Sequence, residues 1–301
     1  MKKNMFLTHL AASLLCVATF ACTPVVPVPD EPDEPEVPEE PEPLPTYYEK
    51  EKGTFRIVSY NVGAFWKYIP DMNENIGLVA SILKEVQADF VGLNELDSMN
   101  TRHHANQVAR LSAAMGDWKW FFGRGIPYKG GAYGNGIIVP RKQYVVEVYN
   151  MALPAPPEGT EARAVSVMET DQAVFAVTHL GSYPAEFHLS QVAALREYVG
   201  LRYGGGTKPV FLMGDMNARL TSAAYAKLSE DWDTISCTTE NTIGGTSPRV
   251  IDYIFHWKNS PAVEVVSAHT ISQCYCGDVS TASDHFPIFV DVKFALPPKE
   301  E

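Results

Sequence analysis

The chain contains short apolar segments, typical of β-strands, that end in a polar side chain. One of them, Val210–Met213, is followed by Gly214, Asp215, Met216 and Asn217. Side chains on a strand alternate between its two faces, so Asp215 and Asn217 are expected to point the same way. A Gly-Asp-x-Asn motif also fits an ordinary turn in which both side chains bond their own backbone. This motif alone does not decide between a site and a turn.

Five further segments repeat the pattern of an apolar run with one polar, metal-competent or proton-carrying side chain. The polar residues are Asn61 after Ser59 and Tyr60, Glu95 after Asn94, His179 after Thr178, Asp252 within Ile251–Phe255, and Asp284 with His285 after Ser283. A core of two sheets lets several strand ends open at one edge, where residues far apart in sequence meet. The segments together therefore predict one polar site.

Periodicity predicts a protein with more strands than helices. Alternating or β-branched runs predict strands at 55–62, 88–93, 118–122, 136–139, 144–148, 162–168, 173–179, 210–213, 250–256, 263–268 and 286–292. Apolar residues at helical spacing predict helices at 76–86 and at about 185–203. This pattern is typical of an α/β protein in which a sheet sandwich is flanked by helices.

In this order the motifs resemble the endonuclease/exonuclease/phosphatase family, which includes DNase I-like nucleases, exonuclease III-like repair enzymes, neutral sphingomyelinases and inositol polyphosphate phosphatases. The resemblance covers about residues 54–294. It implies an α/β (α+β) fold, a four-layer α/β/β/α sandwich with two central sheets between helices. It also implies a phosphoesterase that depends on Mg²⁺ or Mn²⁺ and hydrolyses phosphodiester or phosphomonoester bonds by attack of a metal-activated water.

The resemblance also implies a role for each motif. Glu95 matches the principal metal ligand, and Asn61 and Asp284 match positions that bind or orient the metal or its waters. Asp215 and Asn217 match the pair that contacts the attacking water, the phosphate or a second cation. His285 matches the catalytic histidine, and Asp252 matches the carboxylate that orients it and completes an acid/base dyad.

Other matches separate branches of the family. His179 is shared with the DNase-like, sphingomyelinase-like and phosphatase branches and argues against an abasic-site repair enzyme. A DNase-like enzyme pairs this histidine with a glutamate, but Asn135 stands here, two residues after Tyr133, and Asp97 replaces a DNase-like arginine. An amide cannot share a proton as a carboxylate does, so His179 is interpreted as a phosphate contact.

Three residues are therefore predicted to bind the substrate phosphate, namely Tyr133, Asn135 and Arg163. The position of Arg163 matches a family arginine near the phosphate, and guanidinium binds phosphate bidentately. A surface arginine paired with Glu161 or Glu169 is the alternative.

The first residues predict export. Lys2 and Lys3 precede an apolar stretch from Met5 to Ala21, as in a secretory signal peptide over residues 1–22. The ending Thr19-Phe20-Ala21-Cys22 looks like a loose bacterial lipobox, so Cys22 is expected to carry lipid and to tether the protein to a membrane of the cell envelope. Plain secretion with cleavage nearby is the alternative.

Residues 23–45 are rich in proline, aspartate and glutamate and carry no lysine or arginine. Such a segment has too little apolar surface to fold and is expected to be an extended spacer, with a catalytic domain over residues 46–301. Without the spacer and the leader the chain has 28 acidic and 22 basic residues, a net charge near −6. That is not the basic footprint of a tight DNA binder.

The domain contains three cysteines. In an oxidising envelope Cys237 is predicted to bridge to Cys274 or Cys276, which leaves one thiol over. A zinc site at Cys274 and Cys276 is the rival interpretation.

The substrate is expected to be a phospholipid, a small phosphate ester or a nucleic acid, and no obligate protein partner is implied. A secreted DNase I-like endonuclease is the alternative within the same chemistry. A binding module that kept the fold and lost turnover is the alternative from another class.

Overall fold

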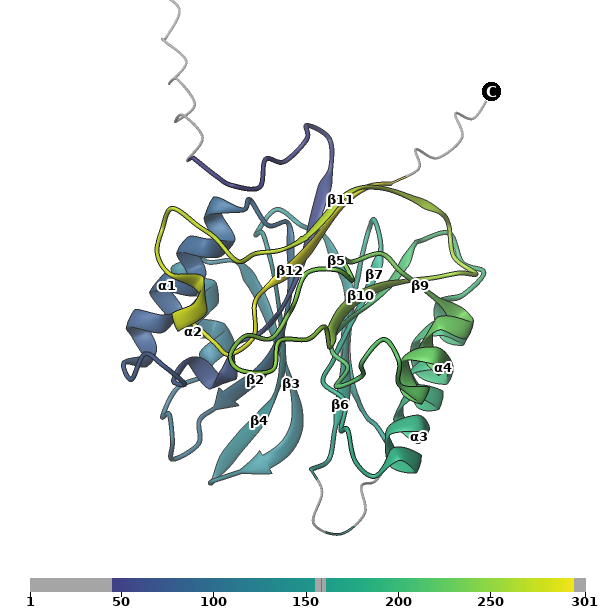
Figure 1. Ribbon diagram of the computed structural model, residues 1–301, viewed down its shortest axis with the longest axis horizontal. Coiled ribbons are helices and arrows are strands. Elements are labelled where there is room, and N and C mark those ends of the chain that lie inside the picture. Colours follow the sequence, from purple (N-terminus) through teal and green to yellow (C-terminus); the bar gives the residue numbers. More distant parts are fainter. Residues whose placement is uncertain (1–44, 155–157, 159–160, 295–301) are drawn as a thin grey trace, which may run out of the picture. The chain divides into compact units, whose positions relative to one another are not determined.

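Two six-stranded sheets pack face to face, with helices on the outer face of each (Figure 1). A computed structural model describes residues 45–154, 158 and 161–294 of the protein. The predicted signal peptide with Cys22, and the spacer as far as residue 44, lie outside these residues. No helix within the described ranges has the length and apolar character needed to span a bilayer.

The first sheet has the strand order β11-β12-β1-β2-β4-β3. Its strands are β1 (Phe55–Asn61), β2 (Phe90–Ser98), β3 (Lys119–Tyr128), β4 (Gly131–Val139), β11 (Val263–Thr270) and β12 (Ile288–Phe294). The second sheet has the order β5-β6-β7-β8-β10-β9. Its strands are β5 (Val145–Ala152), β6 (Ala164–Thr170), β7 (Val174–Thr178), β8 (Val210–Asp215), β9 (Trp232–Thr234) and β10 (Asp252–Trp257).

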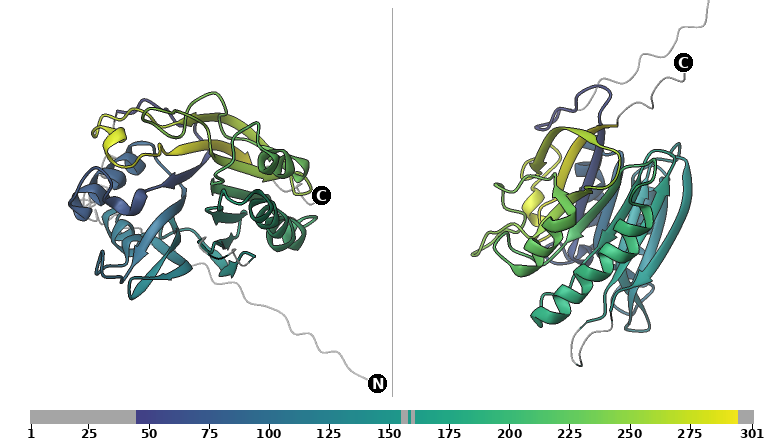
Figure 2. Two further views of the ribbon diagram at one scale, coloured as in Figure 1. Left: turned by 60° about the horizontal axis from the view of Figure 1, so that its bottom comes forward. Right: turned by 90° about the vertical axis from the view of Figure 1, so that its right-hand side faces the viewer.

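Helices cover the outer faces, as Figure 2 shows from two further directions. The helices α1 (Met72–Glu85) and α2 (Gln107–Ala114) lie on the first sheet, and α3 (Ala185–Leu195) and α4 (Ala223–Asp231) lie on the second. The predicted four-layer α/β/β/α sandwich is therefore confirmed.

Alternation along each strand divides the apolar residues among three cores. Val58 packs under α1, whereas its neighbour Ile57 lies between the two sheets. On β8, Leu212 packs towards α3 and α4, whereas Phe211 and Met213 lie between the sheets. This alternation follows from the two-residue period of a strand. Each strand therefore contributes one row of side chains to the inter-sheet core.

The helix boundaries differ from the predicted ones. Helix α1 begins at Met72, because Asp71 Oδ1 accepts hydrogen bonds from the N–H groups of Asn73 (2.8 Å) and Glu74 (3.0 Å) and so caps it. The predicted helix at 185–203 is α-helical only to Leu195 and continues as a π-helical segment, η2 (Arg196–Leu201).

The elements without a prediction are α2, α4, β9 and two short 3-10 helices, η1 (Gly63–Phe65) and η3 (Val279–Thr281). Two of the four buried residues of α2 are polar, Gln107 and Ser112, which breaks its apolar periodicity. Helix α4 buries only Ala224 and Leu228, and two apolar residues are too few to reveal a helical period in the sequence. These two helices form because the adjoining sheet supplies the apolar contacts.

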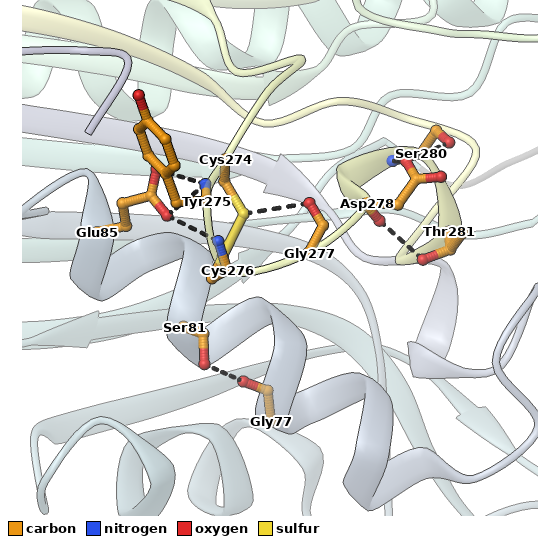
Figure 3. The surroundings of a disulfide bond; sticks show 10 residues. All are labelled: Gly77, Ser81, Glu85, Cys274, Tyr275, Cys276, Gly277, Asp278, Ser280 and Thr281. Carbon is orange, nitrogen blue, oxygen red and sulfur yellow. Dashed lines mark hydrogen bonds between the residues drawn. A yellow bond between two sulfur atoms is a disulfide. The ribbon is translucent and has the colours of Figure 1, made fainter. Parts of the chain in front are cut away.

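The cysteine prediction was wrong. Cys274 and Cys276 form a disulfide with each other, and Cys237 is a free thiol (Figure 3). Their loop lies on α1, where the Glu85 carboxylate accepts the N–H groups of Tyr275 (2.9 Å) and Cys276 (3.1 Å). This local anchoring brings the two neighbouring cysteines together, and sulfurs joined in this way are not thiolate ligands for the zinc site that was the rival interpretation.

Gly92 provides a test of the inter-sheet packing. An added Cβ at Gly92 would lie 2.7 Å from Val177 Cγ2 and 2.9 Å from Met213 Sδ. Overfilling this core is expected to lower the free energy of unfolding of Gly92→Ala by about 1–3 kcal/mol. Gly77, exposed on α1 with nothing near such a Cβ, is the control, and Gly77→Ala is expected to be more stable by about 0.5–1 kcal/mol. Urea midpoints measure both, and equal midpoints would contradict this packing.

Candidate active site

The inter-sheet rows end in polar residues at one edge of the sandwich. On β1 the row through Ile57 ends at Asn61, and on β8 the row through Met213 ends at Asp215. Asn61 is in register with Asn94 of β2, and Asp215 is in register with Asp252 of β10. The same alternation that buries apolar groups between the sheets thus brings amides and carboxylates together where the apolar groups stop.

Asn61 bridges the two sheets. Its side-chain Nδ2 donates to Asp215 Oδ2 at 3.1 Å and to Glu95 Oε1 at 3.0 Å. Ser283 Oγ donates to the Asn61 carbonyl at 2.8 Å and accepts from the His285 N–H at 3.2 Å. The segment that carries Asp284 and His285 is thereby fastened to the end of β1.

Asn94 is a second bridge, one to which the sequence interpretation gave no role. Its Oδ1 accepts the Asp215 N–H at 3.0 Å, and its Nδ2 donates to the Thr178 carbonyl at 3.0 Å and to Asn135 Oδ1 at 2.9 Å. The side chain is fully buried. Because each of these bonds has a buried partner, Asn94 holds the end of β2 against the ends of β7 and β8.

Glu95 does not end its strand as predicted, because β2 continues to Ser98. One extra residue of β2 lies opposite β4 between Leu93 and Leu96, and Glu95 has a left-handed backbone with φ of 61°. Such a bulge redirects a side chain, and a non-glycine residue keeps a left-handed backbone only where its surroundings enforce it. The bulge places Glu95 Oε1 beside Asn61.

Ligand atoms of Glu95, His179 and Asp215 lie within 4.8 Å of one another, and so do those of Asp215, Asp252 and His285. Two carboxylates that share the Asn61 amide form an oxygen-rich, negatively charged pair, which is the donor set that Mg²⁺ or Mn²⁺ prefers. Burial raises the pKa of Asp215, and the neighbouring Asp252 adds to the shift. These groups are the candidate metal site.

Asp284 was expected beside Glu95. It follows Ser283, which binds Asn61, and its carboxylate forms an ion pair with Lys67. It belongs to none of the three ligand groups found among the described residues. Its role as a metal ligand stays a prediction, and Lys67 is a partner that no sequence motif indicated.

His285 and Asp252 form the predicted dyad. His285 Nδ1 lies 2.9 Å from Asp252 Oδ2, which also accepts from Thr242 Oγ1 at 2.6 Å. Burial disfavours the charged imidazole, but the Asp252 carboxylate outweighs it and raises the pKa of His285 to about 10. The other ring nitrogen, Nε2, lies 3.7 Å from Asp215 Oδ2. Asp252 therefore holds Nδ1 in place, and Nε2 faces Asp215.

His179 is buried beside the same carboxylate oxygen of Asp215. Its Nε2 lies 3.4 Å from Asp215 Oδ2 and 3.1 Å from Asn217 Nδ2, and its Nδ1 lies 3.3 Å from Arg163 Nη1. Burial lowers the pKa of His179 well below its usual value, and the Arg163 charge adds to the shift. His179 is therefore a neutral imidazole.

Asp215 and Asn217 both approach His179, as predicted, although the strand ends at Asp215. The turn that follows gives Asn217 a φ of 49°, and Asn217 Nδ2 also donates to the Leu180 carbonyl at 2.8 Å. Helix α3 fixes the same two loops, since Gln191 accepts the Gly181 N–H at 2.9 Å and His188 Nε2 lies 2.9 Å from the Met216 carbonyl. Sequence reasoning missed this role of α3.

The three predicted phosphate contacts have different surroundings. Asn135 is buried, and its amide donates to the Ala164 carbonyl at 3.0 Å as well as binding Asn94, so it holds strands together. Arg163 Nη2 lies 3.6 Å from Glu161, the partner named in the alternative interpretation, while Nη1 lies 3.3 Å from His179 Nδ1. Burial and the nearby Glu95 raise the pKa of Tyr133, which keeps its hydroxyl neutral. Their contacts with phosphate stay predictions.

A cavity of about 660 Å³ opens beside Glu95. Its walls include Trp66, Arg102, Tyr128, Tyr133 and Glu161. A narrow recess next to it is lined by Arg163 and His179 and shares Tyr133, Glu161 and Ala162 with the larger cavity. The candidate metal ligands and the predicted phosphate-binding residues therefore adjoin the larger cavity, which is open to a further part of a substrate.

Comparisons with known proteins identify the family. The family model described as "Endonuclease/Exonuclease/phosphatase family" matches residues 58–285. A search of curated proteins found no match.

Several solved structures have the same fold. An endonuclease/exonuclease/phosphatase from Beutenbergia cavernae is 21% identical, with a TM-score of 0.64, and the match covers 83% of this chain and 74% of that one. A mannosyl-6-phosphatase from Bacteroides thetaiotaomicron is 18% identical, with a TM-score of 0.65 and coverage of 80% and 100%. The human Nocturnin catalytic domain is 20% identical, with a TM-score of 0.59 and coverage of 81% and 94%. With the family model matched over most of the domain, the chain belongs to the endonuclease/exonuclease/phosphatase family.

Proposed function

We propose that the protein is a divalent-metal-dependent phosphoesterase that hydrolyses a small phosphate ester, with Mg²⁺ or Mn²⁺ as its metal. The observation that carries the proposal is the meeting of two imidazoles with the Asn61, Glu95 and Asp215 side chains at one edge of the sandwich. Their order along the chain also matches the family motifs.

Glu95 and Asp215, with Asn61 and Asp284 beside them, would hold the metal. When bound, the metal neutralises charge on the phosphoryl oxygens and lowers the pKa of a bound water. The Asn61 amide fixes one oxygen of each carboxylate, so the pair is ordered before a cation arrives. Such preorganisation reduces the reorganisation that catalysis requires.

The dyad moves the proton. Asp252 holds His285 Nδ1–H, which sets the ring orientation and leaves Nε2 to exchange a proton with the reacting oxygen. Neutral His179 cannot carry a second charge there, so it acts as a hydrogen-bond partner for a phosphoryl or leaving oxygen. Arg163 lies behind it and supplies a fixed positive charge.

A small ester is favoured over a nucleic acid. The folded part carries a net charge near −6. Asp97 replaces the DNase-like arginine and is buried in an ion pair with Arg102. A named phosphatase, the Bacteroides mannosyl-6-phosphatase, is among the structural neighbours. A binding module without turnover is disfavoured, because the sequence retains Asn61, Glu95, His179, Asp215, Asn217, Asp252, Asp284 and His285.

The location of this activity is proposed from residues 1–45. The signal peptide and the lipobox ending at Cys22 support an exported lipoprotein of the cell envelope, with the acidic spacer holding the domain away from the membrane. Mass spectrometry of the N-terminal peptide from expressing bacteria tests this, and an unlipidated Cys22 would leave plain secretion.

A substrate panel tests the function. Hexose phosphates, glycerol phosphate, inositol phosphates, sphingomyelin, plasmid DNA, RNA and bis-p-nitrophenyl phosphate are assayed with Mg²⁺, with Mn²⁺ and with EDTA. We expect a small monoester to have the highest kcat/KM, and EDTA to abolish its turnover. Fastest cleavage of plasmid DNA would favour the endonuclease alternative, and no turnover of any substrate with either metal would contradict the proposal.

A further inference from the structure

Three aromatic side chains surround one guanidinium in the wall of the 660 Å³ cavity. The Arg102 Cζ atom lies 5.2 Å from the ring centroid of Trp66, 5.1 Å from that of Tyr128 and 6.0 Å from that of Tyr133. Cation–π contacts of this kind hold both the rings and the guanidinium in position. The cavity therefore has a preformed aromatic wall.

A buried carboxylate fixes the guanidinium. Arg102 Nε and Nη2 donate to the two oxygens of Asp97 at 2.6 and 2.7 Å, and His103 Nδ1 lies 2.8 Å from the same carboxylate. Asp97 is fully buried, and Gln107 accepts its backbone N–H at 2.7 Å. The positive charge of Arg102 is thus already neutralised.

The charge of the lining limits what the cavity can accept. Glu95 and Glu161 contribute carboxylates, and Arg102 is neutralised by Asp97. Arg163 lines the adjoining recess, not the cavity, and its nearest carboxylate is Glu161. A leaving group with further phosphates would therefore meet net negative charge. An uncharged group with hydroxyls would instead find acceptors in the carboxylates and apolar faces in the aromatic rings.

Resting on the phosphoesterase function proposed above, we propose that this cavity binds the uncharged, hydroxyl-bearing ring of a sugar monophosphate while its phosphate lies beside Glu95, Arg163 and His179. Hydrolysis joins the water oxygen to phosphorus and breaks the ester P–O bond. The proton that the water loses ends on the sugar oxygen, so sugar and inorganic phosphate leave. The cavity and the recess share Tyr133, Glu161 and Ala162, so the proposed positions of the ring and of the phosphate adjoin.

Trp66→Ala tests the proposal. The side chain is 49% exposed, so its removal leaves the core intact. We expect KM for a hexose 6-phosphate to rise about threefold to tenfold, the effect of losing one aromatic contact, with little change in kcat. Glycerol phosphate has no ring to contact Trp66, so its kcat/KM is expected to stay unchanged. Trp120→Ala, which removes a 47% exposed tryptophan from β3 outside the cavity lining, is the matched control.

A second comparison tests the charge argument in the unchanged protein. A hexose 6-phosphate is expected to have a higher kcat/KM than a hexose 1,6-bisphosphate or an inositol polyphosphate. A preference for either of these two, or an equal effect of Trp66→Ala on glycerol phosphate, would overturn the sugar assignment. Metal-dependent turnover of glycerol phosphate would still support the phosphoesterase function in that case.

Binding gives a readout that does not depend on turnover. Isothermal titration calorimetry of the EDTA-treated protein measures the binding of a hexose 6-phosphate and, for comparison, of glycerol phosphate. We expect tighter binding of the hexose ester, weaker binding of that ester in Trp66→Ala and unchanged binding in Trp120→Ala. No ring-dependent binding would overturn the inference, whatever the activity assays give.

Discussion

His285→Ala is expected to lower kcat for the best small ester by about a hundredfold to ten-thousandfold, the contribution of general acid/base catalysis. In the intact protein Asp252 orients the ring, and its carboxylate raises the pKa of His285 to about 10 against the effect of burial. Alanine removes the group that exchanges the proton and leaves KM largely unchanged. Steady-state kinetics with saturating Mg²⁺ measures the change.

Two further variants separate chemistry from folding. His269→Ala removes an exposed histidine of β11 and is expected to keep full activity. Asp252→Asn keeps the shape of the dyad but removes the charge that orients His285, and its kcat is expected to fall as well. Thermal melting shows whether each variant is folded. Full activity in a folded His285→Ala protein would remove His285 from the mechanism.

Glu95→Gln is expected to lower kcat/KM by at least about a hundredfold and to raise the Mg²⁺ concentration needed for half-maximal activity. The amide keeps the size of the side chain but not its charge. Replacing even a residue that only hydrogen-bonds to a metal ligand typically lowers metal affinity or activity by about tenfold to a hundredfold, so the loss of a ligand is expected to exceed this. Glu95 Oε1 accepts from Asn61, and glutamine can still accept there through its carbonyl. The geometry is therefore retained while the metal affinity falls.

The matched control is Glu264→Gln, which removes a charge from a side chain that is 68% exposed on β11. Its metal titration is expected to overlay that of the unchanged protein. If Glu95→Gln also overlays it, the metal lies elsewhere, and the grouping of Glu95 with Asp215 has another explanation.

Much of the site could be predicted because strand periodicity is local. The row on β1 runs from Ile57 to Asn61, and that on β8 runs from Phe211 to Asp215, so the sequence itself shows which polar residues continue the inter-sheet face. The family resemblance added the order of the motifs and the second sheet. The fold, the pairing of His285 with Asp252, and the positions of Glu95 and Asp215 followed from these two sources.

The remainder depends on contacts between distant residues. The bulge at Glu95 depends on how β2 pairs with β4. The contact between His179 and Arg163 depends on how β7, which His179 follows, pairs with β6, which Arg163 precedes. Lys67 reaches Asp284 across more than two hundred residues, and no spacing rule links the two. Asn94 was visible in its motif, but its three buried partners lie on other strands. Periodicity carries no information on such pairings.

The two halves of the catalytic centre belong to different hydrogen-bonded sheets, and their backbones are not paired with each other. The distance between them is set by the thickness of the side-chain layer around Gly92, Val177 and Met213. The packing of that layer therefore determines how far apart the site residues of the two sheets lie. Small changes of side-chain volume in this layer are therefore expected to widen or narrow the gap between the Glu95 and Asp215 carboxylates, although no residue of the site itself is changed.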